Sequence, residues 1–279
     1  MGELSKDELD QYAADGFLLR KGVFDAEEVA ALVAAAEALY AEDSPARTVE
    51  RDGVTVRAVH GCHASSDVFA GLVRDPRMLR PAQQIVGTDD LYIHQSKINA
   101  KRALDGDVWQ WHQDYVFWHE EDGMPAPRVV NLAVLLDAAT DINGPLLLVP
   151  GSHRRGLLAS ERRADEADGS FWDSHLAADL KYTVRVADLV ALSAASGIAS
   201  AVGPAGSVLL FDSQIVHGSG VNMSPIDRRM AIFSYNAAAN VPVAPGAGRP
   251  EFLASRDATP LRPASWRGRL APAGTPGVG

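Results

Sequence analysis

The patterning of the chain changes near residue 90, and this change limits the fold more than any other feature of the sequence. From there on, short apolar or β-branched runs alternate with Gly, Pro, Asn and Asp, which is typical of strands joined by turns. The runs are LYIHQSKIN, VVNLAVLLD, PLLLVPG, SVLLFD and MAIFSYNA. Because helices precede these strands, the sequence predicts an α+β domain with a β-sandwich or barrel core, whose mouth commonly holds a small molecule.

Two N-terminal segments are expected to be helices, and each begins with a capping box. Ser5 and Glu8 have the spacing of such a box in SKDELDQYAADG, where Gly16 can end the helix. Asp25 and Glu28 repeat this spacing in DAEEVAALVAAAEALYAED. The segment RDPRMLRPAQQIVG is expected to form a third helix, although its internal proline interrupts the pattern.

We predict that residues 1–279 form a single domain. A helical N-terminal part would extend over about 1–88, followed by the β core at about 89–240. Within the core, a helical insert is expected at about 158–198. The remainder, about 241–279, is rich in Pro, Gly and Ala and should be irregular coil.

The composition favours a cytoplasmic enzyme that acts on small molecules. Hydrophobic residues make up 47% of the chain, so a sizeable core can form, and a net charge of −10 disfavours a nucleic-acid partner. Cys62 is the only cysteine, which excludes an internal disulfide and a multi-cysteine zinc site. The N-terminus lacks an apolar signal core, and no apolar run reaches the length of a membrane span. The sequence leaves the oligomeric state open.

The crowded segment WQWHQDYVFWHEED contains a His-x-Asp pair, His112 and Asp114. On a strand, residues two apart point to the same face, so these side chains would project together. His217 follows the apolar run SVLLFD, and two histidines with one carboxylate form the facial triad of non-haem iron(II) oxygenases. Arg228, eleven residues further on, is a bidentate donor suited to a carboxylate. Each residue alone fits a core histidine or a solvated arginine, and only the joint arrangement favours a metal site.

These motifs resemble the phytanoyl-CoA dioxygenase superfamily of iron(II)/2-oxoglutarate oxygenases. The resemblance extends from YAADGFLLRKGVFDAEEV through NGPLLLVPGSHRRG to the C-terminal RPEFLASRDATPL. The segments HQSKIN, WHQDYVFWHEEDGMP and HGSGVNMSPIDR are similar to the ectoine hydroxylases. They are closer still to the bacterial trans-4-hydroxylases of free L-proline.

The resemblance implies a fold and a set of cofactors. The fold would be a double-stranded β-helix, the jelly-roll or cupin-like core, with flanking helices. Iron(II) would be held by His112, Asp114 and His217, and dioxygen would react there. The co-substrate 2-oxoglutarate would chelate the iron and extend its distal carboxylate to Arg228 and the hydroxyl of Ser219.

Two polar residues precede the metal motif in the matching strand. In the ectoine hydroxylases a Gln and an Asn at these positions contact 2-oxoglutarate, and they match Gln95 and Asn99 here. Residues four apart on a strand share one face, as two residues that line one pocket should. The alternative is an edge strand whose polar residues face water.

The substrate residues implied by the resemblance have alternatives in ordinary packing. Trp118 matches an aromatic residue of the ectoine hydroxylase pocket, but it is equally consistent with a core tryptophan, and Tyr115 is a further candidate for the pocket wall. Asn131, in an apolar strand, is either satisfied by neighbouring backbone or points at substrate. Arg57 and Arg128 are candidates for the substrate carboxylate, with solvated surface arginine as the alternative.

The acidic run EED at 120–122 is expected to belong to a turn or a short lid rather than to a catalytic carboxylate pair. His119 has an odd offset from Asp114, so on a continued strand it would face away from the metal.

The predicted function is therefore iron(II)/2-oxoglutarate-dependent hydroxylation of a free small amino acid, with L-proline trans-4-hydroxylation as the best match. Pipecolate, ectoine or another small polar metabolite are alternative substrates. A non-catalytic binding protein on the same fold is the alternative from another class, and it is disfavoured because the metal residues and Arg228 are all present.

Overall fold

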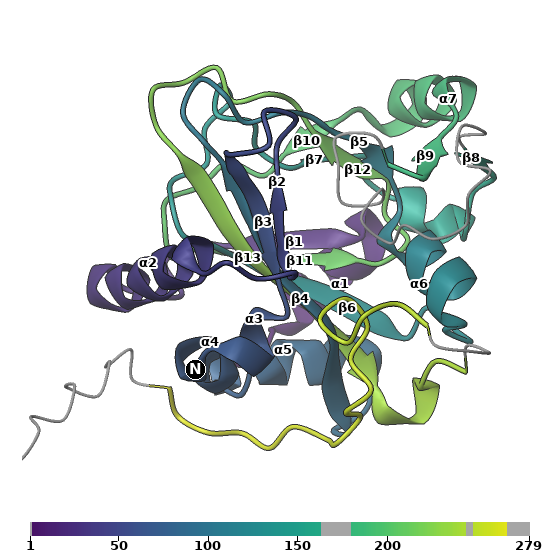
Figure 1. Ribbon diagram of the computed structural model, residues 1–279. Helices are drawn as coiled ribbons and strands as arrows, with labels where there is room; N and C mark the ends of the chain where they lie inside the picture. The colour runs from purple at the N-terminus through teal and green to yellow at the C-terminus, as the bar shows by residue number, and fades with distance from the viewer. Residues whose placement is uncertain (1, 163–179, 244–247, 267–279) are drawn as a thin grey trace, which may run out of the picture.

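The computed structural model describes residues 2–162, 180–243 and 248–266. In this part of the chain, two antiparallel sheets pack face to face (Figure 1). The larger has seven strands, in the spatial order β1 (Phe17–Arg20), β11 (Val208–Asp212), β6 (Val129–Leu135), β13 (Arg228–Ala237), β4 (Leu91–Lys101), β3 (Val56–His60) and β2 (Arg47–Val49). The smaller has four, in the order β10 (Ala199–Ser200), β7 (Leu147–Leu148), β12 (His217–Ser219) and β5 (Trp109–His112).

The inner face of the larger sheet changes from apolar to polar across its width. Towards β11 and β6 it is apolar, and Phe211, Ala133 and Leu135 pack there against Leu148 of the smaller sheet. On β4, side chains on this inner face include Gln95, Lys97, Asn99 and Lys101, because these residues pair with inner-facing positions of β13. Polar side chains are therefore directed into the space between the sheets beside β5 and β12.

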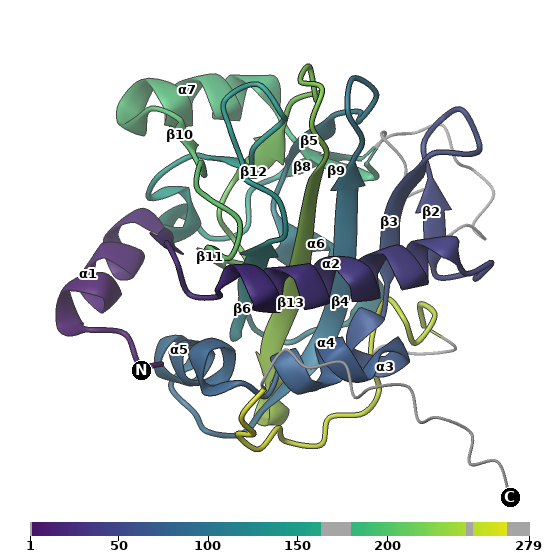
Figure 2. The ribbon, with the colours of Figure 1, turned by 90° about the vertical axis from the view of Figure 1, so that its left-hand side faces the viewer.

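Helices cover the outer face of the larger sheet, and Figure 2 shows α2 lying across the strands. These helices are α1 (Lys6–Asp15), α2 (Ala26–Ala41), α3 (Cys62–Ser65), α4 (Asp67–Leu72) and α5 (Pro76–Val86). Both predicted capping boxes are present, and Gly16 ends α1 in the left-handed conformation with φ 81°. Pro81 lies inside α5 without ending it, since the helix continues to Val86 and buries Met78, Leu79 and Ala82.

Two predicted segments contain strands that the sequence pattern did not indicate. The N-terminal part at 1–88, predicted to be helical, also contributes β1, β2 and β3 to the larger sheet. These strands have five residues or fewer, too short for a clear alternation. The predicted helical insert begins with a strand instead, since β8 (Ser160–Arg162) pairs antiparallel with β9 (Tyr182–Val184), and its last part is helical as α7 (Val186–Ser196). Positions 163–179 of that insert lie outside the described residues.

The rest of the described chain is short or irregular. Helix α6 (Asp114–Asp122) follows β5, and single 3-10 turns lie at Ser152–Arg155 and Ala238–Asn240. As predicted, the described C-terminal residues 248–266 contain neither helix nor strand. Within the described ranges, every helix is too short or too polar to cross a membrane.

Candidate active site

Three side chains converge where β5 and β12 meet. His112 ends β5 and His217 begins β12, and the two residues face each other in the ladder, with ring centroids 4.2 Å apart. Asp114 lies 3.6 Å from Nε2 of His112 and 3.7 Å from Nε2 of His217. All three side chains are buried, and one potential ligand atom from each lies within 4.8 Å of the others.

The route by which these residues converge differs from the prediction. Asp114 is not a strand residue, because β5 ends at His112 and Asp114 is the first residue of α6. The junction turns the carboxylate back towards the strand that it has just left, so the same pair forms from different backbone geometry. His119 therefore lies on a helix, where its Nδ1 is 3.0 Å from the carbonyl oxygen of Met124.

The protonation states in this cluster suit a divalent metal. Nδ1 of His112 lies 2.6 Å from the carbonyl oxygen of Gln110, and Nδ1 of His217 lies 3.0 Å from that of Ile215. A carbonyl can only accept, so each Nδ1 carries the proton and each Nε2 offers a lone pair. Burial lowers the pKa of His217 to about 3 and keeps this ring neutral.

Asp114 is held as a carboxylate in a fixed orientation. Burial alone would raise its pKa, but Lys97 and the two histidines hold the pKa well below the ordinary value. Nδ2 of Asn131 donates to Oδ2 of Asp114 at 2.9 Å, and Oδ1 of Asn131 accepts from Ser234 at 2.7 Å. Asn131 is therefore satisfied by side chains and orients the carboxylate, which was neither of the two expected roles.

A cationic pocket with unfilled donors lies at the beginning of β13. Arg228 is buried, and its Nη2 donates to the carbonyl oxygen of Gly144 at 2.6 Å, while Nε and Nη1 have no partner among the described residues. Ser219 presents a buried hydroxyl in the same condition. Lys101, directly across the ladder from Arg228, donates to the carbonyl of Gly220 beside Ser219. Buried donors without partners are rare in proteins, so an anionic ligand would complete this group.

Local structure fixes this pocket. Gly144 has φ 69°, and a Cβ there would lie 2.6 Å from the carbonyl oxygen of Gly220 and 2.8 Å from Lys101, so a glycine is required. Burial and the neighbouring guanidinium groups lower the pKa of Lys101 to about 6, and burial lowers that of Arg228 to about 10. Among the described residues no carboxylate forms an ion pair with Arg228 or Lys101, so an anionic ligand would bring the balancing charge into this pocket.

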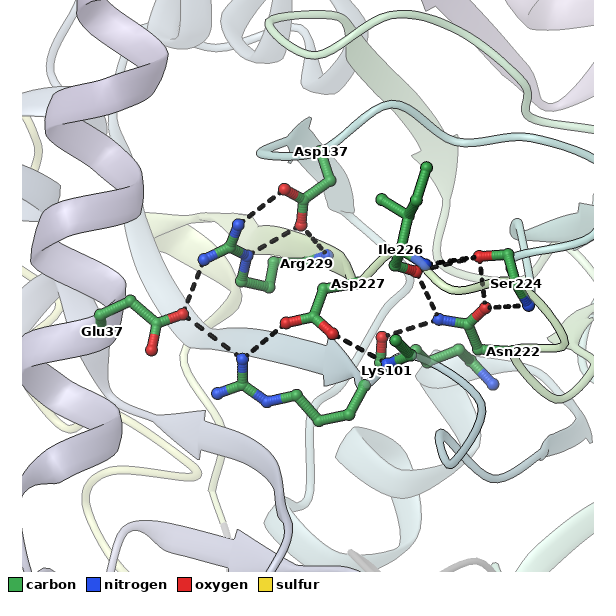
Figure 3. Close-up of polar contacts among 10 residues, drawn as sticks. Glu37, Lys101, Asp137, Asn222, Ser224, Ile226, Asp227 and Arg229 are labelled. Atoms are coloured by element: carbon green, nitrogen blue, oxygen red, sulfur yellow. Dashed lines mark hydrogen bonds and ion pairs between the residues drawn. The ribbon is translucent and has the colours of Figure 1, made fainter.

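The residue next to Arg228 points the other way. Arg229 forms a bidentate pair with Asp137 and a further ion pair with Glu37 of α2 (Figure 3). The same figure shows Asn222 and Ser224 bracing the loop that leads into β13. Adjacent strand residues face opposite sides, so the outward pair anchors the strand and leaves Arg228 directed inward. The two arginines are not the solvated pair considered as an alternative.

Gln95 and Asn99 share one buried face of β4, as predicted. Since β4 pairs with both β13 and β3, the alternative of an edge strand facing water is wrong. Nε2 of Gln95 donates to the carbonyl oxygen of Leu253 at 3.0 Å, whereas Oδ1 of Asn99 has no partner among the described residues.

A small cavity opens beside the triad on the side away from Arg228. Its lining includes His112 and Asp114 together with His60, Gln95, Lys97, Trp109, Phe117, Trp118, Leu180 and Arg249. Lys97 lies 3.8 Å from Asp114. Arg249 comes from the C-terminal segment and forms a bidentate pair with Asp122, which also lies 2.9 Å from Nε2 of His94.

The substrate residues predicted from sequence have different positions in the structure. Trp118 lines the cavity, whereas Tyr115 donates its hydroxyl to the carbonyl oxygen of Met124 and is not part of the lining. Arg57 is fully buried, pairs with Glu50 at 2.9 Å and stacks on Trp109 at 3.8 Å. Arg128 is exposed at the start of β6 and does not line the cavity.

The lining also contains residues that the sequence did not indicate as site residues, among them His60, Lys97, Leu180 and Arg249. Lys97 alone had an accessible signal, because it has the same strand parity as Gln95 and Asn99. The run at 120–122 was expected to be a turn or lid, but it forms the last turn of α6. Asp122 is buried there because it pairs with a residue that lies far away in the sequence.

A family model described as Phytanoyl-CoA dioxygenase (PhyH) matches residues 12–230. The chain belongs to the phytanoyl-CoA dioxygenase family. Among curated relatives, an L-proline trans-4-hydroxylase of Streptomyces griseoviridis is 38% identical over 253 residues, covering 91% of this chain and 93% of the relative. An ectoine dioxygenase of Bordetella bronchiseptica is 37% identical over 264 residues, covering 91% of this chain and 83% of the relative.

Solved structures of this family support the same fold. EctD from S. alaskensis in its apoform has a TM-score of 0.80 at 33% identity, covering 95% of this chain and 88% of that one. The same protein with bound Fe has a TM-score of 0.79 at 31% identity, again covering 95% and 88%. With 2-oxoglutarate and 5-hydroxyectoine it has a TM-score of 0.77 at 33% identity, covering 95% and 87%.

These matches confirm the predicted family, the α+β jelly-roll fold and the enzyme class of 2-oxoglutarate-dependent dioxygenase. The predicted cofactors, iron and 2-oxoglutarate, are those of the family, and the cluster of His112, Asp114 and His217 has the donor set that iron(II) requires. The alternative of a non-catalytic binding protein on the same fold is therefore not supported.

Proposed function

We propose that this chain hydroxylates a free small amino acid, with L-proline as the substrate and trans-4-hydroxy-L-proline as the product. The observation that carries the proposal is the cavity beside the triad, in which Lys97 and three aromatic side chains surround a small space next to Asp114. The 38% identity to an L-proline trans-4-hydroxylase, over nearly the whole of both chains, supports the choice of substrate.

Iron(II) would be held by Nε2 of His112, Nε2 of His217 and the carboxylate of Asp114. Three protein ligands leave coordination positions open for 2-oxoglutarate and dioxygen, and the metal centre supplies the oxidising power for a C–H hydroxylation. Asn131 occupies Oδ2 of Asp114 with a hydrogen bond, so Oδ1 is the oxygen left for the metal. The protein holds the substrate carbon and keeps water away.

The distal carboxylate of 2-oxoglutarate would be bound by Arg228, Ser219 and Lys101. Nε and Nη1 of Arg228 lie on opposite sides of the guanidinium group and lack partners among the described residues, so each can donate to a carboxylate oxygen, alone or together with the second hydrogen of Nη2. Asn99, on the same face of β4 as Lys101, would contact the co-substrate between this pocket and the metal. Gln95 was predicted to share that role, but we assign it to the substrate because it lines the cavity with Trp118.

The substrate carboxylate would be bound by Lys97. Arg249 is a weaker candidate because its Nε and Nη2 already form a bidentate pair with Asp122. Among the described residues, the one ion pair of Lys97 is with Asp114, at 3.8 Å, and a metal bound to Asp114 would neutralise that carboxylate. The apolar ring of proline would lie against Phe117 and Trp118.

Gln95 offers a ligand in the cavity a hydrogen-bond acceptor. Its Nε2 is committed to the carbonyl oxygen of Leu253, which leaves Oε1 as an acceptor for a ligand. An ammonium group on the substrate needs such acceptors.

Ectoine is the second candidate, since the ectoine dioxygenase relatives are nearly as similar as the proline hydroxylase. The test measures succinate release and hydroxylated product with L-proline, L-pipecolate and ectoine, with His217→Ala as the inactive control. We expect L-proline to give coupled turnover, and pipecolate, with one extra methylene, to be about 10–200-fold poorer. Coupled turnover of ectoine with none of proline would refute the substrate and leave the enzyme class intact.

A further inference from the structure

His60 lies in the cavity wall with neither ring nitrogen hydrogen-bonded. It ends β3, its side chain is 1% exposed, and both Nδ1 and Nε2 lack a partner among the described residues. The mechanism proposed above makes no use of it. A buried imidazole with two unsatisfied nitrogens is uncommon, and its place in the lining points to a ligand that satisfies one of them.

The neighbours of His60 define what that ligand carries. In the ladder between β3 and β4, His60 lies directly opposite Lys97, so the two side chains stand side by side on one face of the sheet. Lys97 on β4 and Arg249 on the C-terminal segment are the charged groups that act on it. Burial, then these two cations, lower the pKa of His60 to about 3, so the ring is neutral. A neutral imidazole offers one acceptor nitrogen.

A hydrogen-bond acceptor beside a cation is complementary to an α-amino acid, which carries an ammonium group beside a carboxylate. The ammonium and carboxylate groups of such a molecule are attached to the same carbon, so they can reach two adjacent side chains at once. Building on the proposed function, we infer that His60 accepts a hydrogen bond from the α-ammonium group of the substrate while Lys97 binds its carboxylate. His60 is then a specificity residue for amino acids over other carboxylates of the same shape.

The experiment compares L-proline with tetrahydrofuran-2-carboxylate, in which an oxygen atom replaces the ring nitrogen. Dissociation constants are measured by calorimetry on the full chain with nickel(II) in place of iron and with 2-oxoglutarate present, so that no turnover occurs. His60→Leu removes the acceptor, and His60→Gln retains one. Thermal unfolding establishes that each variant is folded before binding is measured.

We expect the wild-type protein to prefer L-proline to the oxygen analogue. His60→Leu should weaken L-proline binding on the order of tenfold to a hundredfold, with little change for the analogue or for 2-oxoglutarate. His60→Gln should recover part of the preference. If His60→Leu does not fold, wild type and His60→Gln are compared instead. Glutamine presents its acceptor less favourably than histidine, so His60→Gln should bind L-proline more weakly while its affinity for the oxygen analogue stays the same.

Two results would overturn the inference. Equal weakening of both ligands in His60→Leu would show that the ring only supports the cavity wall. A wild-type protein that binds neither L-proline nor another α-amino acid would refute the proposed function, and the role of His60 with it. Binding of L-proline by the wild type together with an unchanged preference in both variants would refute the role of His60 alone.

Discussion

Two buried arginines, Arg228 and Arg249, lie at opposite ends of the same interior space and are in opposite states. Arg249 uses Nε and Nη2 of its guanidinium group in a bidentate pair with Asp122. Arg228 makes one hydrogen bond to a backbone carbonyl and leaves two nitrogens unpaired. Arg249 therefore stabilises the cavity wall, whereas Arg228 has donors available for an anion. The sequence indicated the role of Arg228 through its position after His217 and gave no signal for Arg249. Predictions on this pair, and on the metal ligands between them, follow in order of expected effect.

The largest effect should come from the residues between the two arginines. We expect His112→Ala and His217→Ala to reduce turnover below detection, because each removes a metal ligand. Both variants should remain folded by circular dichroism, and the purified proteins should contain less iron than wild type. A near-normal rate in either variant would show that the histidine is not a ligand.

Arg249→Ala should chiefly destabilise the protein. It leaves Asp122 buried without its partner, and breaking a buried pair in this way costs about 3–5 kcal/mol. Thermal or urea unfolding measures this loss, with Arg128→Ala as the matched control, because an exposed arginine should change stability by less than about 0.5 kcal/mol. The apparent affinity for 2-oxoglutarate should stay unchanged in folded Arg249→Ala. A loss of stability in Arg249→Ala no larger than in Arg128→Ala would show that the pair of Arg249 and Asp122 does not stabilise the cavity wall.

Arg228→Ala should weaken ligand binding and leave stability nearly unchanged, the reverse of Arg249→Ala. We expect little loss of stability, since the variant removes a buried charge whose donors are mostly unfilled. Binding of 2-oxoglutarate should weaken by roughly 3 kcal/mol, about a hundredfold, because a buried carboxylate loses its charged hydrogen-bond partner. Arg229→Ala is the control at the adjacent position, since its side chain pairs on the outer face. An unchanged KM for 2-oxoglutarate in Arg228→Ala, or an equal change in both variants, would contradict this assignment.

The smallest effect concerns the proton on Lys101. Burial and two neighbouring arginines lower its pKa to about 6, so between pH 6 and 10 the folded protein holds this proton less than the unfolded chain does. Stability from this residue therefore rises with pH across that window. A bound carboxylate raises the pKa again, so 2-oxoglutarate binding near pH 7.5 should take up close to one proton. Calorimetry in buffers of different ionisation enthalpy measures this uptake, which should vanish in Lys101→Met.

The helices and the metal motif could be predicted from the sequence because they depend on residues that are close together in the chain. The boxes Ser5–Glu8 and Asp25–Glu28 depend on residues three positions apart, and both were correctly predicted. His112 and Asp114 were found for a partly wrong reason, because the residue spacing brings them together at a strand end as well as along a strand. Their partner His217 was identified from residue type and the resemblance, and the cross-strand pairing explains its place.

The residues around the substrate cavity could not be predicted from the sequence in this way. His60 comes beside Lys97 only through the pairing of β3 with β4, and nothing local in VRAVH indicates that strand. Arg249 pairs with Asp122 across more than a hundred residues of chain. Arg57 looked like a surface residue because its partner Glu50 and the ring of Trp109 approach it only in the folded molecule.

The C-terminal segment gives the protein a modular design. The metal ligands and the pocket of Arg228 come from residues before 230, whereas residues 248–266 close the other end by pairing Arg249 with Asp122 and holding Gln95 through Leu253. The oxidising centre and this part of the recognition surface are therefore separate stretches of the gene. Substitutions in this segment would change the cavity through Arg249 and through the backbone carbonyl of Leu253 that holds Gln95, while the oxygen chemistry stays constant. Exchange of this segment between relatives would change these contacts while the metal ligands stay the same.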